Sequence, residues 1–188
     1  MRADAARRRQ GIIRAAKHVF AERGGDVALE VVAAASGVGI ATLYRNFPSR
    51  YDLVYAVVED TVERILDAVT AARGAAGQDP SAAWADLLAR LVDMELGALI
   101  DAIGLQARSG SKDASALGHL QQPALDALDE LLSVLKDAAA IRRDIKALEV
   151  IVAVATITRP QVTPIREAAP AVHRQLADAY LAWSRSDQ

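Results

Sequence analysis

Residues 32–47 read VAAASGVGIATLYRNF, and this stretch decides the expected fold. Two short helices are predicted here, one over about Leu29–Ala35 and one over about Ile40–Asn46, with a turn at Gly37 between them. The consecutive alanines let the two helix backbones approach closely, and glycine permits the turn. This layout is typical of a helix-turn-helix, whose second helix enters the major groove of DNA.

The apolar residues of this segment are assigned to packing. Val38 is expected under the turn, while Val32 and Leu43 fill a small core against Phe20 and Phe47. The other side chains of the second helix face outward to varying degrees, and they combine hydrogen-bond donors with small apolar groups that suit a groove. They are Ile40, Ala41, Thr42, Tyr44, Arg45 and Asn46.

Four of these residues are candidates for base contacts. Arg45 can bond bidentately to a guanine edge, which contributes roughly 1–3 kcal/mol of discrimination. Thr42 can bond a base or a phosphate, and its methyl group can touch a thymine methyl. Ile40 and Ala41 can make only apolar contacts, most usefully with thymine.

Three residues are candidates for phosphate contacts. Tyr44 and Asn46 carry donors that position a helix without specifying sequence, and Arg50 begins the next helix, where free backbone amides also favour an anion. Each assignment has a structural alternative. Tyr44 could lie partly in the core, Asn46 could be a local cap, and Arg45 could pair with an acidic neighbour.

The charge distribution also separates the two ends of the chain. The net charge is −2, but residues 1–50 carry nine Lys/Arg and four Asp/Glu, whereas residues 51–188 carry thirteen and twenty. A basic N-terminal part on an acidic remainder is expected where only one end meets phosphate. A solvated basic tail would give the same asymmetry.

Composition excludes several classes of protein. The 188 residues are 52% hydrophobic and 24% charged, which fits a soluble globular protein of one or two domains. We find no run of 18 apolar residues and no secretory signal, so we expect no membrane partner and a cytoplasmic location. With no cysteine in the chain, disulfides and thiolate metal sites are excluded.

The competing hypothesis is a small all-helical enzyme whose N-terminal motif is accidental. The sequence has no Gly-rich phosphate loop and no plausible nucleophile-base pair. His18, His119 and His173 fall on different predicted helices and have no metal-ligand spacing. We therefore predict that the protein is not an enzyme and that it needs no cofactor.

Apolar periodicity predicts helices along the rest of the chain, and strand-like alternation is scarce. Ser49, Ser81 and Asp144 are the expected N-caps of the fourth, fifth and penultimate long helices, and residues 109–113 form a polar loop. The predicted helices span about 7–23, 29–35, 40–46, 50–72, 81–96, 98–108, 115 or 122 to 139, 145–158, and a last helix ending near 183.

Five short segments together resemble the TetR family of transcriptional regulators. They are RRQGIIRAA at 8–16, VFAERG at 19–24, VA at 32–33, SGV at 36–38 and TLYRNFPSR at 42–50. The resemblance covers nearly all of residues 8–54. A shorter similarity, AIRRDI at 140–145, matches the turn before the penultimate helix in many members of the family.

The resemblance implies an all-α fold with two domains. Residues 1–50 would form a three-helix DNA-binding domain with the helix-turn-helix, and residues 51–188 a helical-bundle domain for ligand binding and dimerisation. It also implies a homodimer on a palindromic double-stranded DNA operator, most simply a repressor that a small-molecule effector releases. Helix four, which connects the two domains, would be the lever for that release.

By matched position, the recognition helix is Gly39 to Asn46. The resemblance assigns base contacts to Ile40, Ala41, Thr42 and Arg45, and phosphate contacts to Tyr44, Asn46 and Arg50. The start of helix two, near Ala28 and Leu29, would approach the DNA backbone as well.

Two hydroxyl groups usual in the family are missing from this chain. The family commonly has a hydroxyl residue near Ala28 and a serine at the position of Gly39, so backbone anchoring is expected to be modestly weaker. A family member that has kept the fold but binds a protein is therefore a third hypothesis.

Residues 51–188 hold more apolar surface than DNA reading requires. A pocket for a hydrophobic or amphipathic effector is expected between helices four to seven, although plain core is an alternative for each lining residue. The candidates are Ile65, Trp84, Leu88, Leu91, Met94, Glu95, Leu99, Ile103, Gln106 and Leu128. By the resemblance, the last two long helices form the dimer interface, and their wide apolar faces agree with this; burial of the same faces within the monomer is the alternative. The interface candidates are Val152, Ala155, Leu176, Ala179, Tyr180 and Trp183.

Overall fold

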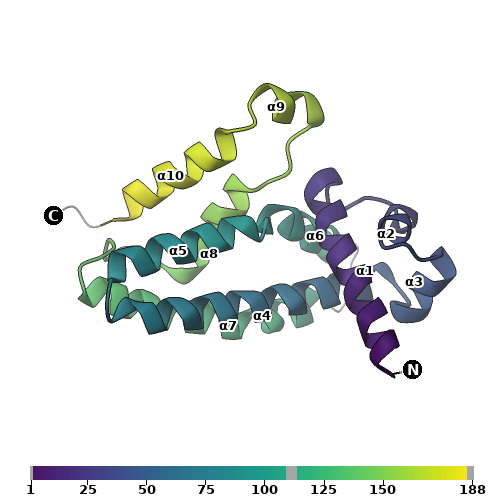
Figure 1. Cartoon of the computed structure of the whole chain (residues 1–188), viewed down its shortest axis with the longest axis horizontal. Coiled ribbons are helices and arrows are strands. Elements are labelled where there is room, and N and C mark those ends of the chain that lie inside the picture. The colour runs from purple at the N-terminus through teal and green to yellow at the C-terminus, as the bar shows by residue number, and fades with distance from the viewer. Residues whose placement is uncertain (1, 109–113, 186–188) are drawn as a thin grey trace. The chain divides into compact units, whose positions relative to one another are not determined.

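The computed structural model describes residues 2–108 and 114–185, and these residues form ten helices and no strand (Figure 1). The all-α prediction is confirmed. The helices are α1 (Arg2–Arg23), α2 (Leu29–Ala35), α3 (Ile40–Asn46), α4 (Arg50–Ala76), α5 (Pro80–Asp93), α6 (Leu96–Arg108), α7 (Ala114–Asp137), α8 (Ala147–Ile157), α9 (Thr163–Ala168) and α10 (Val172–Ser184). The loop predicted at 109–113 lies outside the described residues.

The chain divides into two compact units. The first unit comprises Met1–Thr61 and Ala98–Leu120, and the second comprises Val62–Gly97 and Gln121–Gln188. Helices α4, α6 and α7 each contribute residues to both units.

In the first unit, α2 contacts α1, and α3 contacts α2 (Figure 1). The apolar stripe of α1 is buried, as its spacing predicted, and Phe20 is almost completely covered. Val32, Leu43 and Phe47 are buried as well, so the expected small core is present. Burying large apolar side chains of this kind contributes roughly 1.5–3 kcal/mol each.

Two local features set the geometry of the helix-turn-helix. Gly37 has φ +70, a conformation in which a side chain would be strained, and its amide donates to the Ala34 carbonyl at 3.1 Å. At the start of α4, the Ser49 hydroxyl accepts a hydrogen bond from the Asp52 amide at 3.1 Å, while the Asp52 carboxylate accepts from the Ser49 amide at 2.9 Å. This reciprocal capping confirms Ser49 as the N-cap of α4.

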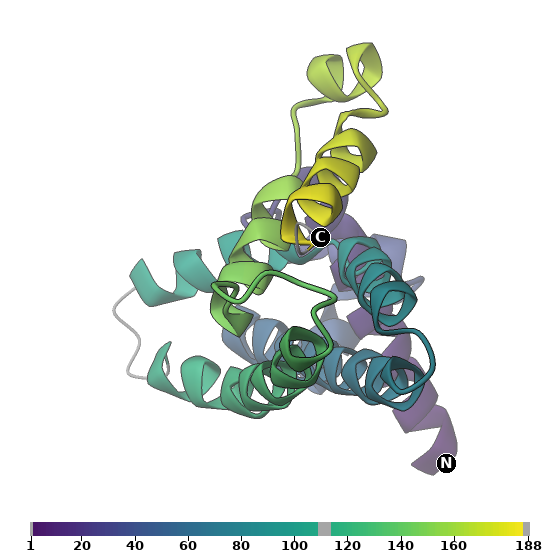
Figure 2. The same cartoon turned by 90° about the vertical axis from the view of Figure 1, so that its left-hand side faces the viewer.

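In the second unit, α5, α8 and α10 contact one another. The core is aliphatic around one fully buried tryptophan, Trp84, and includes Leu87, Leu91, Leu128, Leu131, Leu132, Leu135, Val150 and Val154. Figure 2 shows α9 as the yellow-green coil at the tip of the segment that joins α8 to α10.

Two predicted caps are wrong. Helix α5 begins two residues earlier than expected, because Asp79 accepts a hydrogen bond from the Ala82 amide at 2.9 Å and Pro80 takes the first helical position. Ser81 lies inside the helix. Helix α8 begins at Ala147, with Lys146 rather than Asp144 at the N-cap. Asp144 instead pairs with Arg142 at 3.0 Å, and this bond lowers the pKa of Asp144 below its ordinary value.

Other helix ends also differ from the prediction. Helix α1 starts earlier, α4 extends four residues further to Ala76, and α7 begins at Ala114 and continues through Pro123. The break between α5 and α6 falls at Glu95, which adopts φ +54, and α9 was not predicted. Among the described residues, no helix is long and apolar enough to cross a membrane.

Candidate functional site

Helix α3 presents one buried side and one exposed side. Leu43 is fully buried, whereas Ala41, Tyr44 and Arg45 are exposed, and Tyr44 keeps 44% of its surface accessible. Tyr44 therefore is not part of the core. Ile40, Thr42 and Asn46 are half-buried at the edges of the exposed side.

The polar side chains of α3 bond to one another in the free protein. The Arg45 guanidinium donates to Thr42 Oγ1 at 2.9 Å and, through Nε, to the Ala41 carbonyl at 3.3 Å. Asn46 Nδ2 donates to the Thr42 carbonyl at 2.8 Å. Arg45 and Thr42 are thus held together on one side of the helix, and neither observed partner of Arg45 is acidic.

The N-caps of α2 and α3 lack side-chain hydrogen bonds, as expected from the missing hydroxyls. Ala28 (φ −62, ψ 140) and Gly39 (φ −71, ψ 150) both have the extended backbone of an N-cap. Leu29 is buried, so this residue can present only its backbone to a ligand.

Arg50 makes a contact that the sequence did not reveal. Its guanidinium donates to the Gly25 carbonyl at 3.0 Å and to the Val27 carbonyl, which holds the loop between α1 and α2. On the same loop, a Cβ added to Gly25 would lie 2.5 Å from backbone and side-chain atoms of Ala102 in α6. Two contacts therefore fix the loop between α1 and α2: the hydrogen bonds from the Arg50 guanidinium and the close packing of Gly25 against Ala102.

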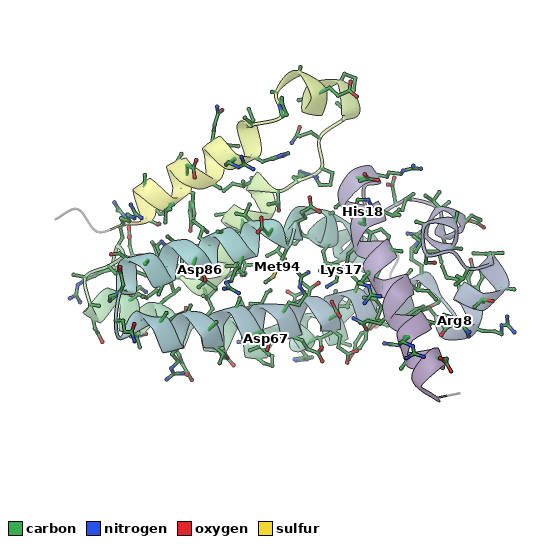
Figure 3. All side chains as sticks on the ribbon, viewed as in Figure 1. Arg8, Lys17, His18, Asp67, Asp86 and Met94 are labelled. Carbon is green, nitrogen blue, oxygen red and sulfur yellow. The ribbon has the colours of Figure 1, made fainter. Side chains whose placement is uncertain are left out.

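A second tie within the first unit joins α1 to α4. Lys17 and Gln10 both donate to the carboxylate of Asp60, and the Lys17–Asp60 pair is largely buried, with 18% of each side chain exposed. Lys17 is labelled on α1 in Figure 3. Salt screens partly buried ion pairs less than surface pairs. The Lys17–Asp60 pair therefore stabilises the contact between α1 and α4 even at high ionic strength.

The candidate effector residues are divided between the two units. Ile65, Trp84, Leu88, Leu91 and Leu128 are buried in the second unit, where Met94 is half-buried and Glu95 is exposed. Leu99 and Ile103 are half-buried in the first unit, and the side chain of Gln106 lies outside the described residues. The Trp84 indole donates to Ser184 Oγ, so its polar atom is already engaged.

The candidate dimer residues mostly lie on the surface of the second unit. Val152 and Trp183 are about half exposed (50% and 51%), Leu176 and Ala179 are also exposed, Tyr180 is half-buried and Ala155 is buried. The Arg142 guanidinium lies 5.0 Å from the centroid of the Trp183 ring, a cation–π contact that the sequence did not predict. Burial raises the pKa of Tyr180 to about 12.

Two family models match the chain. The model described as "Bacterial regulatory proteins, tetR family" matches residues 12–57, and the model described as "Transcriptional regulator SbtR-like, C-terminal domain" matches residues 79–182. The chain belongs to the TetR family. It is thus a DNA-binding transcriptional regulator of a non-enzymatic family, whose members typically act as homodimers and commonly as repressors.

Solved structures of TetR regulators cover almost the whole chain. A regulator from Streptomyces coelicolor is 32% identical, with a TM-score of 0.64, over 96% of this chain and 99% of its own. One from Mycobacterium vanbaalenii is 28% identical, with a TM-score of 0.56, over 95% and 97%. LfrR from Mycobacterium smegmatis, solved in complex with proflavine, has a TM-score of 0.65 at 22% identity over 94% and 93%, which shows the fold alone.

No curated protein matches the chain. Among the described residues of this TetR-family regulator, no group of three His, Cys, Asp or Glu side chains could hold a metal ion.

Proposed function

We propose that the protein is a ligand-responsive repressor that binds a palindromic operator as a homodimer and is released by a small hydrophobic or amphipathic effector. The observation that carries this proposal is the exposed side of α3, where Arg45 and Thr42 lie bonded together at 2.9 Å. A base edge can replace Thr42 as the partner of the Arg45 guanidinium, because guanine offers two acceptors to its fork.

Around this pair we assign base contacts to Ile40, Ala41, Thr42 and Arg45. Tyr44 and Asn46 are assigned to phosphates, since one is exposed and the other lies at the edge of the exposed side. Asn46 gives up its bond to the Thr42 carbonyl, or shares it, when it donates to DNA.

Arg50 is assigned a positioning role in addition to phosphate binding. Its two bonds to the carbonyls of Gly25 and Val27 fix the loop that leads into α2, and hence the backbone near Ala28 and Leu29 that approaches the DNA. The carbonyl partners are neutral and do not cancel the positive charge of the guanidinium. The group can therefore still attract a nearby phosphate.

The proposed homodimer uses α8 and α10. Val152, Leu176 and Trp183 present apolar surface that a monomer would leave in water, and burial of such surface favours association. A palindromic operator also requires two recognition helices related by a twofold axis.

We assign residues 1–50 to DNA binding and residues 51–188 to effector binding and dimerisation, all within the cytoplasm. The candidate lining is mostly aliphatic, which supports an apolar or amphipathic effector, and LfrR in complex with proflavine is an example of a small molecule on this fold. Such a ligand acts only through its differential affinity for DNA-competent and DNA-incompetent states.

The test is selection of duplexes from a randomised pool by the purified protein, followed by binding measurements at two salt concentrations. We expect an enriched palindrome, and an affinity that falls steeply as salt rises, because counterions return to the phosphates. If no duplex is enriched, or if the affinity does not change with salt concentration, the proposed binding to DNA is wrong. A family member that binds a protein would then be favoured.

A further inference from the structure

Three consecutive arginines stand on the N-terminal half of α1, before the part of the chain that matches the TetR family model. Arg7, Arg8 and Arg9 are all exposed, whereas the match begins at residue 12. Arg7 forms an ion pair with Asp4 one turn earlier. Among the described side chains, no carboxylate pairs with Arg8 or Arg9, so no ion pair offsets the attraction of these two residues for an anion.

The position of Arg9 is known from its contact with the end of the recognition helix. Its guanidinium carbon lies 5.0 Å from the centroid of the Phe47 ring. Phe47 is the C-cap residue of α3, and its amide donates to the Leu43 carbonyl at 2.8 Å. The cation–π contact therefore holds one arginine of the cluster directly beside the helix that reads the groove.

Helical geometry places Arg8 on the same side of α1. Arg8 and Arg9 precede the buried pair Ile12 and Ile13 by one turn, so they continue the side of α1 that packs onto its neighbours. They lie beyond the end of the core, where the side chains reach solvent. Figure 3 labels Arg8 on this part of the helix.

We propose that Arg8 and Arg9 form a second DNA-contact site in each subunit, which binds backbone phosphates flanking the half-site that α3 reads. This proposal rests on the DNA-binding function proposed above. The guanidinium fork matches phosphate oxygens in a bidentate geometry, and its charge stays constant across physiological pH. Contacts of this kind add affinity and fix orientation but carry no sequence information.

The experiment uses the palindrome that the wild-type protein selects, as two duplexes. The short duplex ends at the last selected base pair, and the long duplex adds about one helical turn, roughly 10 base pairs, on each side. Fluorescence anisotropy gives the dissociation constant of the full-length protein on each duplex over a series of salt concentrations. The variant is the double substitution Arg8→Gln with Arg9→Gln.

On the long duplex, the double variant should bind at least about tenfold more weakly at physiological salt, with a slope of log K against log salt reduced by about 3–4 for the dimer. On the short duplex, it should match the wild type. The matched control is Arg64→Gln with Arg90→Gln, which removes two exposed charges of the second unit and should leave both duplexes unaffected.

Two further variants separate charge from folding. Arg8→Gln alone leaves the Phe47 contact intact and should give about half of the change in slope. Arg9→Lys keeps the charge and should keep most of the slope. Thermal unfolding of each variant shows whether loss of the ring contact has altered stability.

Wild-type affinity of the double variant on the long duplex would overturn the proposal, and so would an equal loss on the short and long duplexes. Failure of the wild-type protein to select any duplex is a different result, because it removes the proposed function itself.

Discussion

The indole Nε1 of Trp84 donates a 2.8 Å hydrogen bond to the hydroxyl of Ser184, and neither side chain is exposed to solvent. Ser184 in turn donates to the Leu181 carbonyl at 2.9 Å. The bond joins the N-terminal half of α5 to the last residue of α10, so it helps to hold α10, a helix of the proposed dimer interface, against α5. Any effector in contact with Trp84 would meet the ring and not its N–H group.

Substitution of Ser184 by alanine should destabilise the protein by about 1–3 kcal/mol, because the buried indole donor would lose its acceptor. Chemical denaturation measures the change. Ser133→Ala is the control, since Ser133 is exposed and bonds only a carbonyl of its own helix. Equal losses in the two variants would show that the buried bond contributes nothing specific.

The N-cap of α2 offers a stabilising substitution. Ala28 already has the extended backbone of an N-cap but no side-chain acceptor, so Ala28→Ser should raise the free energy of unfolding by about 1 kcal/mol. The same hydroxyl should strengthen binding to all duplexes equally, whatever their sequence, because it donates to a backbone phosphate. Ala28→Gly, which adds no hydroxyl, serves as control; an increase in affinity there would contradict the role of the hydroxyl.

Arg45→Ala should relax base preference at one position of each half-site, with a loss of discrimination of about 1–3 kcal/mol. Tyr44→Phe, which removes a single hydroxyl, should weaken binding to all sequences alike. Competition between the selected duplex and single-base variants measures both effects. An unchanged order of preference in Arg45→Ala would show that another residue reads the base.

Arg50→Lys distinguishes loop positioning from simple phosphate attraction. Lysine keeps the charge but cannot reproduce the planar fork that bonds the Gly25 and Val27 carbonyls together. We expect stability to fall by about 1–2 kcal/mol and affinity to fall on all duplexes, with little change in salt slope. If Arg50→Lys retains wild-type stability and affinity, charge alone is sufficient at this position.

A charge on the exposed side of α10 should break the dimer. Leu176→Glu is the sharper variant, because in Trp183→Glu the new carboxylate could pair with Arg142, which now lies over the ring. Light scattering should show the mass of a monomer for Leu176→Glu. Val134→Glu, at an exposed apolar position on α7, is the matched control and should remain a dimer. A monomeric wild type, or a dimeric Leu176→Glu, would remove this interface.

Local sequence determined most of the helices. The bounds of α2 and α3 agree with prediction, because turn residues and apolar spacing act within a few positions along the chain. The buried side of α1 and the cap at Ser49 follow for the same reason. Helix ends were less predictable where two residues competed for one cap, as Asp79 and Ser81 did before α5.

Only the tertiary structure decided which distant polar groups meet. Arg50 donates to the carbonyls of residues 25 and 27, and Lys17 donates to the carboxylate of Asp60. Trp84 donates to Ser184, which lies a hundred positions later in the sequence. Periodicity predicts that a side chain faces inward or outward, but not which acceptor lies opposite it. That choice depends on how helices far apart in sequence cross, because a hydrogen bond requires two particular atoms to lie within about 3 Å of each other.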